Sequence, residues 1–214
     1  MTHKLKKKIT GILAVAVLIC GLPFTAFAKT NSKSFSKGEI KDNKYVNEYF
    51  GYSIGAPKGY SFYDDKDLAE FNEVTEAFIK DADAVKKSID AGEAVILAYA
   101  EGSDGYSNVN VGVSQGGAEI EKLDDKKEVY EEYVDAIKET LESMGFTVEK
   151  TGVKDEKIDG EKTYSLWSKS SIKGIDLYQK QTMFFTDDYI MTVTATTIGE
   201  DKTDDIFKEI KKLS

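Results

Sequence analysis

The chain has 214 residues and a formal net charge of −9, and lysine supplies all 29 of its basic residues. Because arginine is absent, the planar two-pronged contacts by which guanidinium groups hold phosphates and carboxylates are excluded. The negative charge also disfavours binding to nucleic acid and to anionic membrane surfaces.

The first 28 residues have the pattern of a secretory signal peptide. Four lysines between positions 4 and 8 form a positive segment, residues 12–22 form an apolar segment, and Ala26-Phe27-Ala28 offers a peptidase site. The apolar segment is shorter than the roughly 20 residues needed to cross a bilayer. The sequence therefore predicts cleavage after Ala28 and a mature chain that begins at Lys29 and has no transmembrane segment.

A lipid anchor on Cys20 is the alternative to cleavage after Ala28. Cys20 lies near the end of the apolar segment, but it follows Ile19, and lipoprotein signals place a small residue before the cysteine. The good peptidase site further along also favours cleavage. We therefore expect a secreted or extracellular protein, with association with the cell envelope left open.

Removal of the leader changes the chemistry that is available, because His3 and Cys20 are the chain's only histidine and cysteine. Disulfides, cysteine nucleophiles, histidine-dependent triads and zinc sites made of cysteine and histidine are then excluded. The leader holds four lysines and no acidic residue, so 25 lysines and 38 acidic residues remain, a net charge of −13. We expect no cofactor, no metal site and no catalytic residue.

After the leader, the sequence predicts one linker and one domain. Residues 29–42 are polar, rich in serine and lysine and without periodicity, which is typical of a flexible linker. Residues 43–214 contain no second linker and no repeat, and they are numerous enough to form one domain with its own core.

The domain opens with short predicted strands. Residues 45–50 and 52–54 have strand composition around Gly51, and Pro57-Lys58-Gly59 marks a turn before an extended stretch at 60–63.

The rings in this opening segment allow either an exposed platform for sugars or a packed core. Because side chains of a strand alternate between two faces, only one side of each strand can be exposed, and packing is the favoured interpretation. We expect the following side chains to be buried: Phe50, Ile54, Tyr60 and Phe62.

An amphipathic stretch runs from Asp67 to Ala91, with a capping box at Asp67 and Glu70. A break near Asp81 is possible, so both one helix and two helices are compatible with the sequence. The acidic residues at its start suit a helix N-terminus and lack the spacing of a calcium-binding loop.

Two strands are predicted at 94–100 and 107–114, and the turn 101–106 joins them. Asp125 then caps a predicted helix whose apolar stripe ends at Gly145.

From residue 146 the apolar pattern has a period of two, which predicts a four-strand meander through residue 197. Its turns fall at Asp159-Gly160, Lys173-Gly174 and 186–188. A final helix is predicted from Asp201 to Leu213. Strands joined by short turns require an antiparallel sheet, and amphipathic helices must cover it, so the fold class is α+β with a central antiparallel sheet.

The opening segment resembles the start of PsbP-like domains through Tyr49-Phe50-Gly51-Tyr52-Ser53-Ile54 and Ala56-Pro57-Lys58-Gly59-Tyr60. The resemblance continues through Ser107 to Val111 and the hairpin Ile158-Asp159-Gly160, and in element order it covers most of residues 43–213. Tyr60 stands where the pattern usually has tryptophan.

The PsbP-like group includes an extrinsic subunit of the oxygen-evolving complex and a Ran-binding nuclear import factor, and this chain is most similar to its small secreted members in Gram-positive bacteria. The resemblance implies an α/β/α sandwich and a history of protein binding. It transfers no catalytic residue, because a fold does not determine a site.

Two places offer candidate binding residues. Near the turn at Gly105 the candidates are Asp104, Tyr106, Asn108 and Asn110, whose oxygens turn chemistry explains equally well. On the meander the candidate is Trp167, which alternation places on the face opposite Tyr164 and Leu166, and core packing is its favoured interpretation.

The sequence thus favours a secreted, non-catalytic binding or protein-interaction domain, whose partner is an extracellular protein or a cell-envelope component. The alternative is an extracellular hydrolase acting on glycans, because glycoside hydrolysis needs only two carboxylates and the chain has 38 acidic residues. The ligand and the oligomeric state are not indicated.

Overall fold

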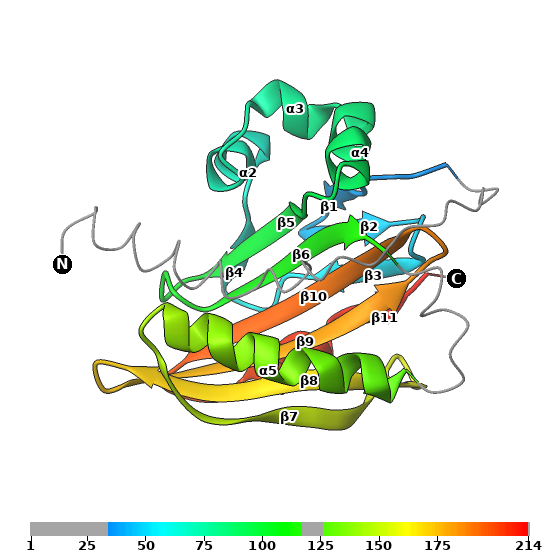
Figure 1. Cartoon of the computed structure of the whole chain (residues 1–214). Helices are drawn as coiled ribbons and strands as arrows, with labels where there is room; N and C mark the ends of the chain where they lie inside the picture. Colours follow the sequence, from blue (N-terminus) through cyan, green and yellow to red (C-terminus); the bar gives the residue numbers. More distant parts are fainter. Residues whose placement is uncertain (1–33, 117–125, 214) are drawn as a thin grey trace.

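The computed structural model describes residues 34–116 and 126–213 (Figure 1). These residues form one seven-stranded antiparallel sheet, one four-stranded antiparallel sheet and five helices. The prediction of an α+β fold built on antiparallel strands is confirmed.

The seven-stranded sheet has the order β4-β5-β6-β10-β9-β8-β7. The predicted meander is confirmed as β7 to β10, and the dipeptides Asp159-Gly160 and Lys173-Gly174 turn with positive φ at both residues, as a tight hairpin requires. The strands are β4 Tyr60–Phe62, β5 Val95–Gly102, β6 Asn108–Gln115, β7 Thr147–Ile158, β8 Glu161–Ile172, β9 Ile175–Phe185 and β10 Tyr189–Ile198.

The four-stranded sheet has the order β1-β2-β3-β11, and its strands are β1 Glu39–Lys41, β2 Lys44–Asn47, β3 Tyr52–Gly55 and β11 Ile210–Lys212. The structure differs here from the flexible linker predicted at 29–42, because β1 lies within it. Long-range contacts hold this polar segment: the Tyr45 hydroxyl donates to the Lys37 carbonyl at 2.8 Å, and the Phe35 ring meets the Tyr189 ring edge-on at 5.1 Å.

The predicted strand 45–50 ends at Asn47. The Asn47 side-chain oxygen accepts hydrogen bonds from the backbone N–H groups of Tyr49 and Phe50, which favours a turn over a longer strand. Gly51 completes the turn with a φ of 78°, and β3 follows. Phe50 therefore lies in a turn, yet it is buried with Ile54 in the main core, and Tyr60 and Phe62 pack partly buried against that core.

The amphipathic stretch forms three short helices, α2 Asp65–Phe71, α3 Glu76–Lys80 and α4 Ala82–Asp90, instead of the one or two that were considered. Asp64, not Asp67, caps the first helix. Thr75 caps the second, and Asp81 ends the second while its side chain caps the third. Polar side chains that bond the backbone locally thus divide a continuous apolar pattern.

Helix α5 spans Lys127–Ser143 and buries its predicted apolar stripe; the predicted cap Asp125 lies outside the described residues. The predicted C-terminal helix is wrong beyond Phe207, because α6 covers only Thr203–Phe207 and β11 follows. Ile210 pairs with Ile54 of β3, so strand pairing with a distant segment replaces further helical turns.

The two faces of the large sheet have different covers. One face packs against the small sheet, α4 and α6 in the main core, which includes Ile54, Val85 and Val111. Helix α5 lies over the other face at β7 and β8, and α2 packs at β5 (Figure 1). A second sheet, together with α4 and α6, thus covers the face where the predicted α/β/α sandwich places a helical layer.

Candidate functional site

The face of the large sheet that carries α2 and α5 also carries two rows of polar side chains, because the strand registers align polar positions of neighbouring strands. The Tyr99 row consists of Tyr99, Asn110, Thr194 and Gln181, on β5, β6, β10 and β9. The Glu101 row consists of Glu101, Asn108, Thr196, Gln179, Ser168 and Thr151, and crosses six strands from β5 to β7. We call the two rows together the polar face.

Strand alternation explains how the sequence builds this face. In β10 the apolar side chains of Val193 and Ala195 enter the main core, so Thr194 and Thr196 point to the opposite side. The same alternation in β6 buries Val109 and Val111 in that core and places the asparagines of the two rows on the polar face.

The polar face holds a set of hydrogen-bonding atoms that the fold leaves unpaired. Within the described residues, eight buried side-chain nitrogen or oxygen atoms lack a hydrogen-bond partner, and strand alternation puts all eight on this face. Four belong to the Tyr99 row, three to the Glu101 row and one to the next position along β8. They are Tyr99 Oη, Asn110 Oδ1, Thr194 Oγ1, Gln181 Nε2, Gln179 Oε1, Ser168 Oγ, Thr151 Oγ1 and Ser170 Oγ.

Unpaired buried polar atoms are unfavourable, since each costs about 1–3 kcal/mol relative to a hydrogen-bonded one. A concentration of them on one face of one sheet is therefore not explained by stability. The polar face is therefore the part of the described chain where side-chain hydrogen bonding is least complete.

Other atoms of the rows are tied to one another, which fixes the orientation of the amides. Asn110 Nδ2 donates to Asn108 Oδ1 at 3.0 Å, and Asn108 Nδ2 donates to the Tyr106 carbonyl at 3.3 Å. Gln179 Nε2 donates to Thr196 Oγ1 at 3.3 Å. The amide oxygens of Asn110 and Gln179 are consequently held as acceptors.

The Tyr99 end of the polar face is bounded by aromatic rings. The Tyr99 ring lies 4.7 Å from the Tyr63 ring and 4.7 Å from the Phe71 ring, centroid to centroid. Burial raises the pKa of Tyr99 above its usual range, and nearby Tyr63 and Glu101 raise it further, so its hydroxyl remains a hydrogen-bond donor. Glu101, the one charged member of the rows, accepts a hydrogen bond from the Tyr63 hydroxyl at 2.7 Å.

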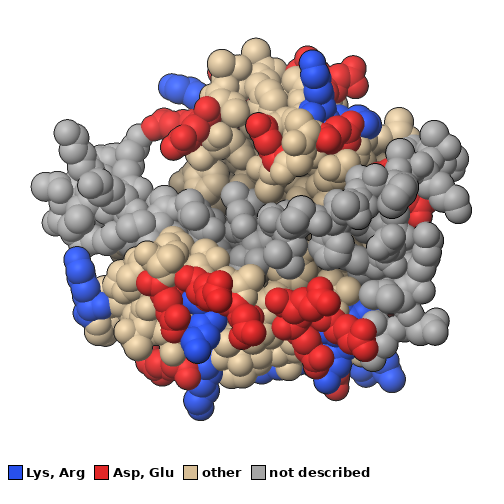
Figure 2. Space-filling view, in the orientation of Figure 1, with Lys and Arg blue, Asp and Glu red and all other residues tan. Residues whose placement is uncertain are grey.

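The helices on either side of the polar face carry mostly negative charge. Figure 2 shows acidic side chains gathered over α5 and over the helical region α2 to α4. Six acidic residues of α5 are exposed: Glu128, Glu131, Glu132, Asp135, Glu139 and Glu142. The face thus combines uncharged hydrogen-bonding groups with a surround that disfavours anions.

The structure brings two of the predicted binding residues together and separates the others. Asn108 and Asn110 lie side by side on the polar face. Tyr106 is half-buried and packs against the apolar cluster beneath α5. Trp167 faces the other side of the sheet, where its indole lies over Gly152 and Lys154 Nζ lies 4.4 Å from the ring centroid.

Asp104 shapes its own turn. Its Oδ1 accepts hydrogen bonds from the backbone N–H groups of Tyr106 and Ser107, both at 2.8 Å, and its Oδ2 accepts one from the Ser107 hydroxyl at 2.6 Å. Burial works to raise the pKa of Asp104, but these hydrogen bonds outweigh burial and lower the pKa. Both carboxylate oxygens of Asp104 are therefore used by hydrogen bonds within the turn.

Sequence reasoning missed the members of the rows on β7 to β10, such as Thr194 and Gln181. Polar residues that alternate with apolar ones predict an ordinary solvent-facing side of a strand. One feature of the sequence could have indicated these positions: amide and hydroxyl residues recur in β6, β9 and β10, with no lysine or acidic residue on the same side of the strand. Only the strand register shows that these residues form rows across the sheet.

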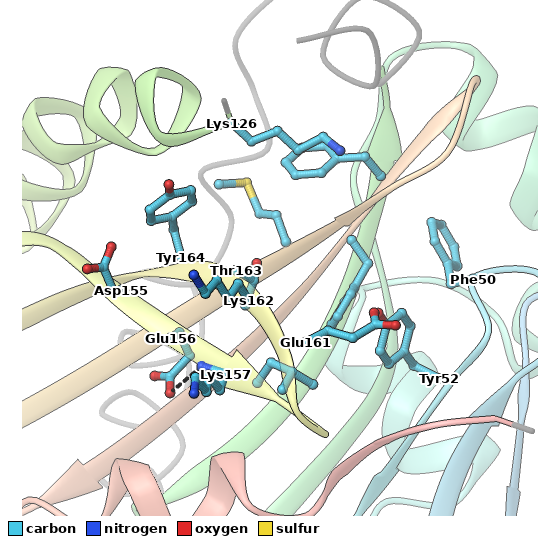
Figure 3. A pocket seen from close by; sticks show the side chains of 14 residues that line it. Phe50, Tyr52, Lys126, Asp155, Glu156, Lys157, Glu161, Lys162, Thr163 and Tyr164 are labelled. Atoms are coloured by element: carbon cyan, nitrogen blue, oxygen red, sulfur yellow. Dashed lines mark hydrogen bonds between the residues drawn. The ribbon is translucent and has the colours of Figure 1, made fainter. Parts of the chain in front are cut away.

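A separate surface cavity of about 1110 Å³ lies where the β7–β8 hairpin approaches Phe50, Tyr52 and Phe184 (Figure 3). Its lining includes three acidic side chains, Asp155, Glu156 and Glu161, and two of them form ion pairs. Glu161 pairs with Lys212 at 2.5 Å, and Glu156 forms an ion pair with Lys180.

No helix among the described residues is both long and apolar enough to cross a membrane. In the same part of the chain, no group of three or more histidine, cysteine, aspartate or glutamate residues is placed to hold a metal ion. The chain has a single cysteine, so it forms no internal disulfide. Comparison with models of known protein families and with curated proteins finds no match.

Proposed function

We propose that the chain is exported and that its mature form is a non-catalytic binding protein whose ligand lies on the polar face. One observation carries this proposal: the eight buried, unpaired polar atoms share one face of the large sheet. The fold bears their cost without gaining stability from them, which is the usual relation between a binding site and its scaffold.

The resemblance of the opening segment to PsbP-like domains supports the same proposal, because that group includes protein-binding members. The proposed ligand comes from the extracellular space or the cell envelope, in agreement with the secretory leader. Membership of the PsbP-like group remains part of the proposal and supplies no site residue.

The proposal is tested by sedimenting the exported protein with the insoluble cell envelope of its host. Two variants, Thr194→Val and Gln181→Met, replace an unpaired polar atom by an apolar group of similar size. Thr147→Val, an exposed position on β7, is the matched control. We expect the parent and the control to sediment with the envelope and both polar-face variants to remain largely in solution.

Equal sedimentation of all four proteins would remove the polar face from the function. The release of soluble sugars is measured in the same tubes. Steady release by the parent, abolished by one Asp or Glu substitution, would overturn the non-catalytic proposal in favour of a glycan hydrolase.

A further inference from the structure

The large sheet opens into a fork between β8 and β9. These two strands pair with each other only as far as Leu166 and Gln181. Beyond that point β8 remains paired with β7 to Glu161, and β9 remains paired with β10 to Phe185. Within the described residues, each strand therefore has a partner strand on one side only in this region. We call the opening between them the β8–β9 fork.

The fork is fixed from both ends. At its open end, the β7–β8 hairpin is tied to the small sheet: the backbone N–H of Lys212 donates to Asp159 Oδ2 at 3.2 Å, and Lys212 Nζ pairs with Glu161 at 2.5 Å. At its inner end, the Tyr130 hydroxyl of α5 accepts a hydrogen bond from the Met183 N–H at 2.9 Å and donates one to the Met183 carbonyl at 3.2 Å. The Tyr130 hydroxyl thus occupies the place of a β8 backbone and keeps the two strands apart.

Backbone groups nearer the open end also point into the fork. In an antiparallel ladder, the N–H and C=O of one residue point to the same side, and successive residues alternate. Because Met183 points toward β8, Phe185 does too, whereas Phe184 between them points toward β10. The Tyr164 carbonyl accepts a hydrogen bond from a side chain of β9 at 3.0 Å, so the backbone of Lys162, two residues earlier, also faces the fork. Lys162 and Phe185 can therefore pair with a chain that lies between the strands.

The cavity of about 1110 Å³ lies in this fork, and both β8 and β9 line it (Figure 3). Met183 and Phe185 belong to the apolar cluster beneath α5, and Phe184 lies on the other side, where its ring centroid is 3.9 Å from that of Tyr52. Ligand pockets typically have volumes of about 300–1,000 Å³, so the cavity has room for a few residues of extended chain. Side chains that alternate between the two sides of such a chain would meet apolar groups on each side.

The charges around the cavity favour an acidic ligand. Of the acidic residues in its lining, Glu156 and Glu161 are engaged in ion pairs, and Asp155 is exposed. Lysines stand at three further lining positions, and none of them forms an ion pair within the described part of the chain: Lys126, Lys157 and Lys162. The charges that are not engaged are therefore mainly positive, although the chain as a whole is acidic.

We propose that the β8–β9 fork binds an extended, acidic peptide segment of another protein, which adds a short strand to the large sheet. Its backbone pairs with Lys162 and Phe185, as open strand edges pair with added strands. Its apolar side chains lie against Met183 on one side and Phe184 and Tyr52 on the other, and its carboxylates meet the lysines of the rim. This site goes beyond the function proposed above, because it lies outside the two polar rows and binds through backbone pairing.

The first experiment measures fluorescence anisotropy of a labelled peptide of about eight residues, in which valine alternates with glutamate or threonine. In one matched peptide lysine replaces glutamate, and in another the backbone nitrogens are methylated. Both should bind at least about tenfold more weakly, because they lose charge attraction or backbone hydrogen bonds. Lys162→Glu should weaken binding of the acidic peptide about fivefold or more. Lys138→Glu, an exposed position of α5 outside the cavity, is the matched control and should bind like the parent.

The second experiment locates the bound peptide by amide hydrogen exchange. In the free protein, the Phe185 N–H should exchange much faster than the Phe184 N–H, which pairs with β10. The acidic peptide should slow exchange at Lys162 and Phe185 by at least about tenfold. Thr194→Val, which alters the polar face, should leave peptide binding unchanged, so the two sites are tested separately.

Four results would overturn the inference. The first is no binding of the acidic peptide at concentrations up to about 1 mM. The second is equal binding of either matched peptide. The third is a Phe185 N–H that is as protected as that of Phe184 in the free protein, which would show that the fork is closed. The fourth is protection by the peptide at the edge strands β1 or β7 instead of at the fork.

Discussion

Thr194→Val provides a test of the polar face that needs no ligand. Threonine and valine have nearly the same shape and both suit a strand, so the substitution changes little except the hydroxyl. Thr194 is fully buried, and its Oγ1 has no partner among the described residues. An unpaired buried hydroxyl costs about 1–3 kcal/mol, so its removal should raise the free energy of unfolding by about 1 kcal/mol.

Thr182 on the neighbouring strand is the matched control, because it is equally buried but its hydroxyl donates to the Tyr164 carbonyl at 3.0 Å. Thr182→Val should lower the free energy of unfolding by about 1–2 kcal/mol, since a net-favourable hydrogen bond is lost. For a protein of this size, 1 kcal/mol corresponds to about 2–4 °C in melting temperature. The two variants should therefore move the melting temperature in opposite directions.

Calorimetry and urea unfolding of the protein and both variants provide the measurement. If Thr194→Val destabilises the free protein as much as Thr182→Val, then the Thr194 hydroxyl is already paired in the absence of ligand. The polar face would then lack the unpaired hydroxyl on which its proposed binding role depends.

Phe50→Ala should lower the free energy of unfolding by about 3–5 kcal/mol in a denaturation experiment, because Phe50 is buried in the main core. A variant with the melting temperature of the parent would show that the ring is not packed. Asp104→Asn should lower the free energy of unfolding near pH 6, and this loss should shrink as the pH falls below about 4. The reason is that the pKa of Asp104 is lowered in the folded protein, so its carboxylate stabilises the fold only while it is charged. A loss that is the same at every pH would contradict this prediction. Lys180→Met should lower the free energy of unfolding by about 3–5 kcal/mol, because it leaves Glu156 without its buried partner. An unchanged midpoint of urea unfolding would refute this prediction. The intact mass of the exported protein should correspond to a chain that starts at Lys29, whereas a mass that includes an acylated Cys20 would show membrane anchoring.

Local patterns were sufficient to predict the meander, because its strands are adjacent in the sequence and Asp159-Gly160 and Lys173-Gly174 specify tight turns. Prediction failed where the partner is distant. β11 pairs with β3 across more than 150 residues, and residues 206–210 have an apolar spacing that suits a helix equally well.

The candidate site shows the same division. Asn108 and Asn110 were found because they follow a recognisable turn. Thr194, Gln181 and Gln179 were missed because a row across a sheet is a property of the register, and no single strand contains it. The missing hydrogen-bond partners become apparent only when all six strands are in place.

The pairing of β11 with β3 affects the order in which the chain can complete its fold. The hairpin of β2 and β3 lies early in the chain, but Ile54 receives its strand partner Ile210 only near the end of the chain. Until then, one edge of β3 exposes unpaired backbone groups, which are prone to pair with other chains. Strand β11 therefore closes this sheet late, and a chain shortened before Ile210 would present an open edge of β3 to neighbouring chains.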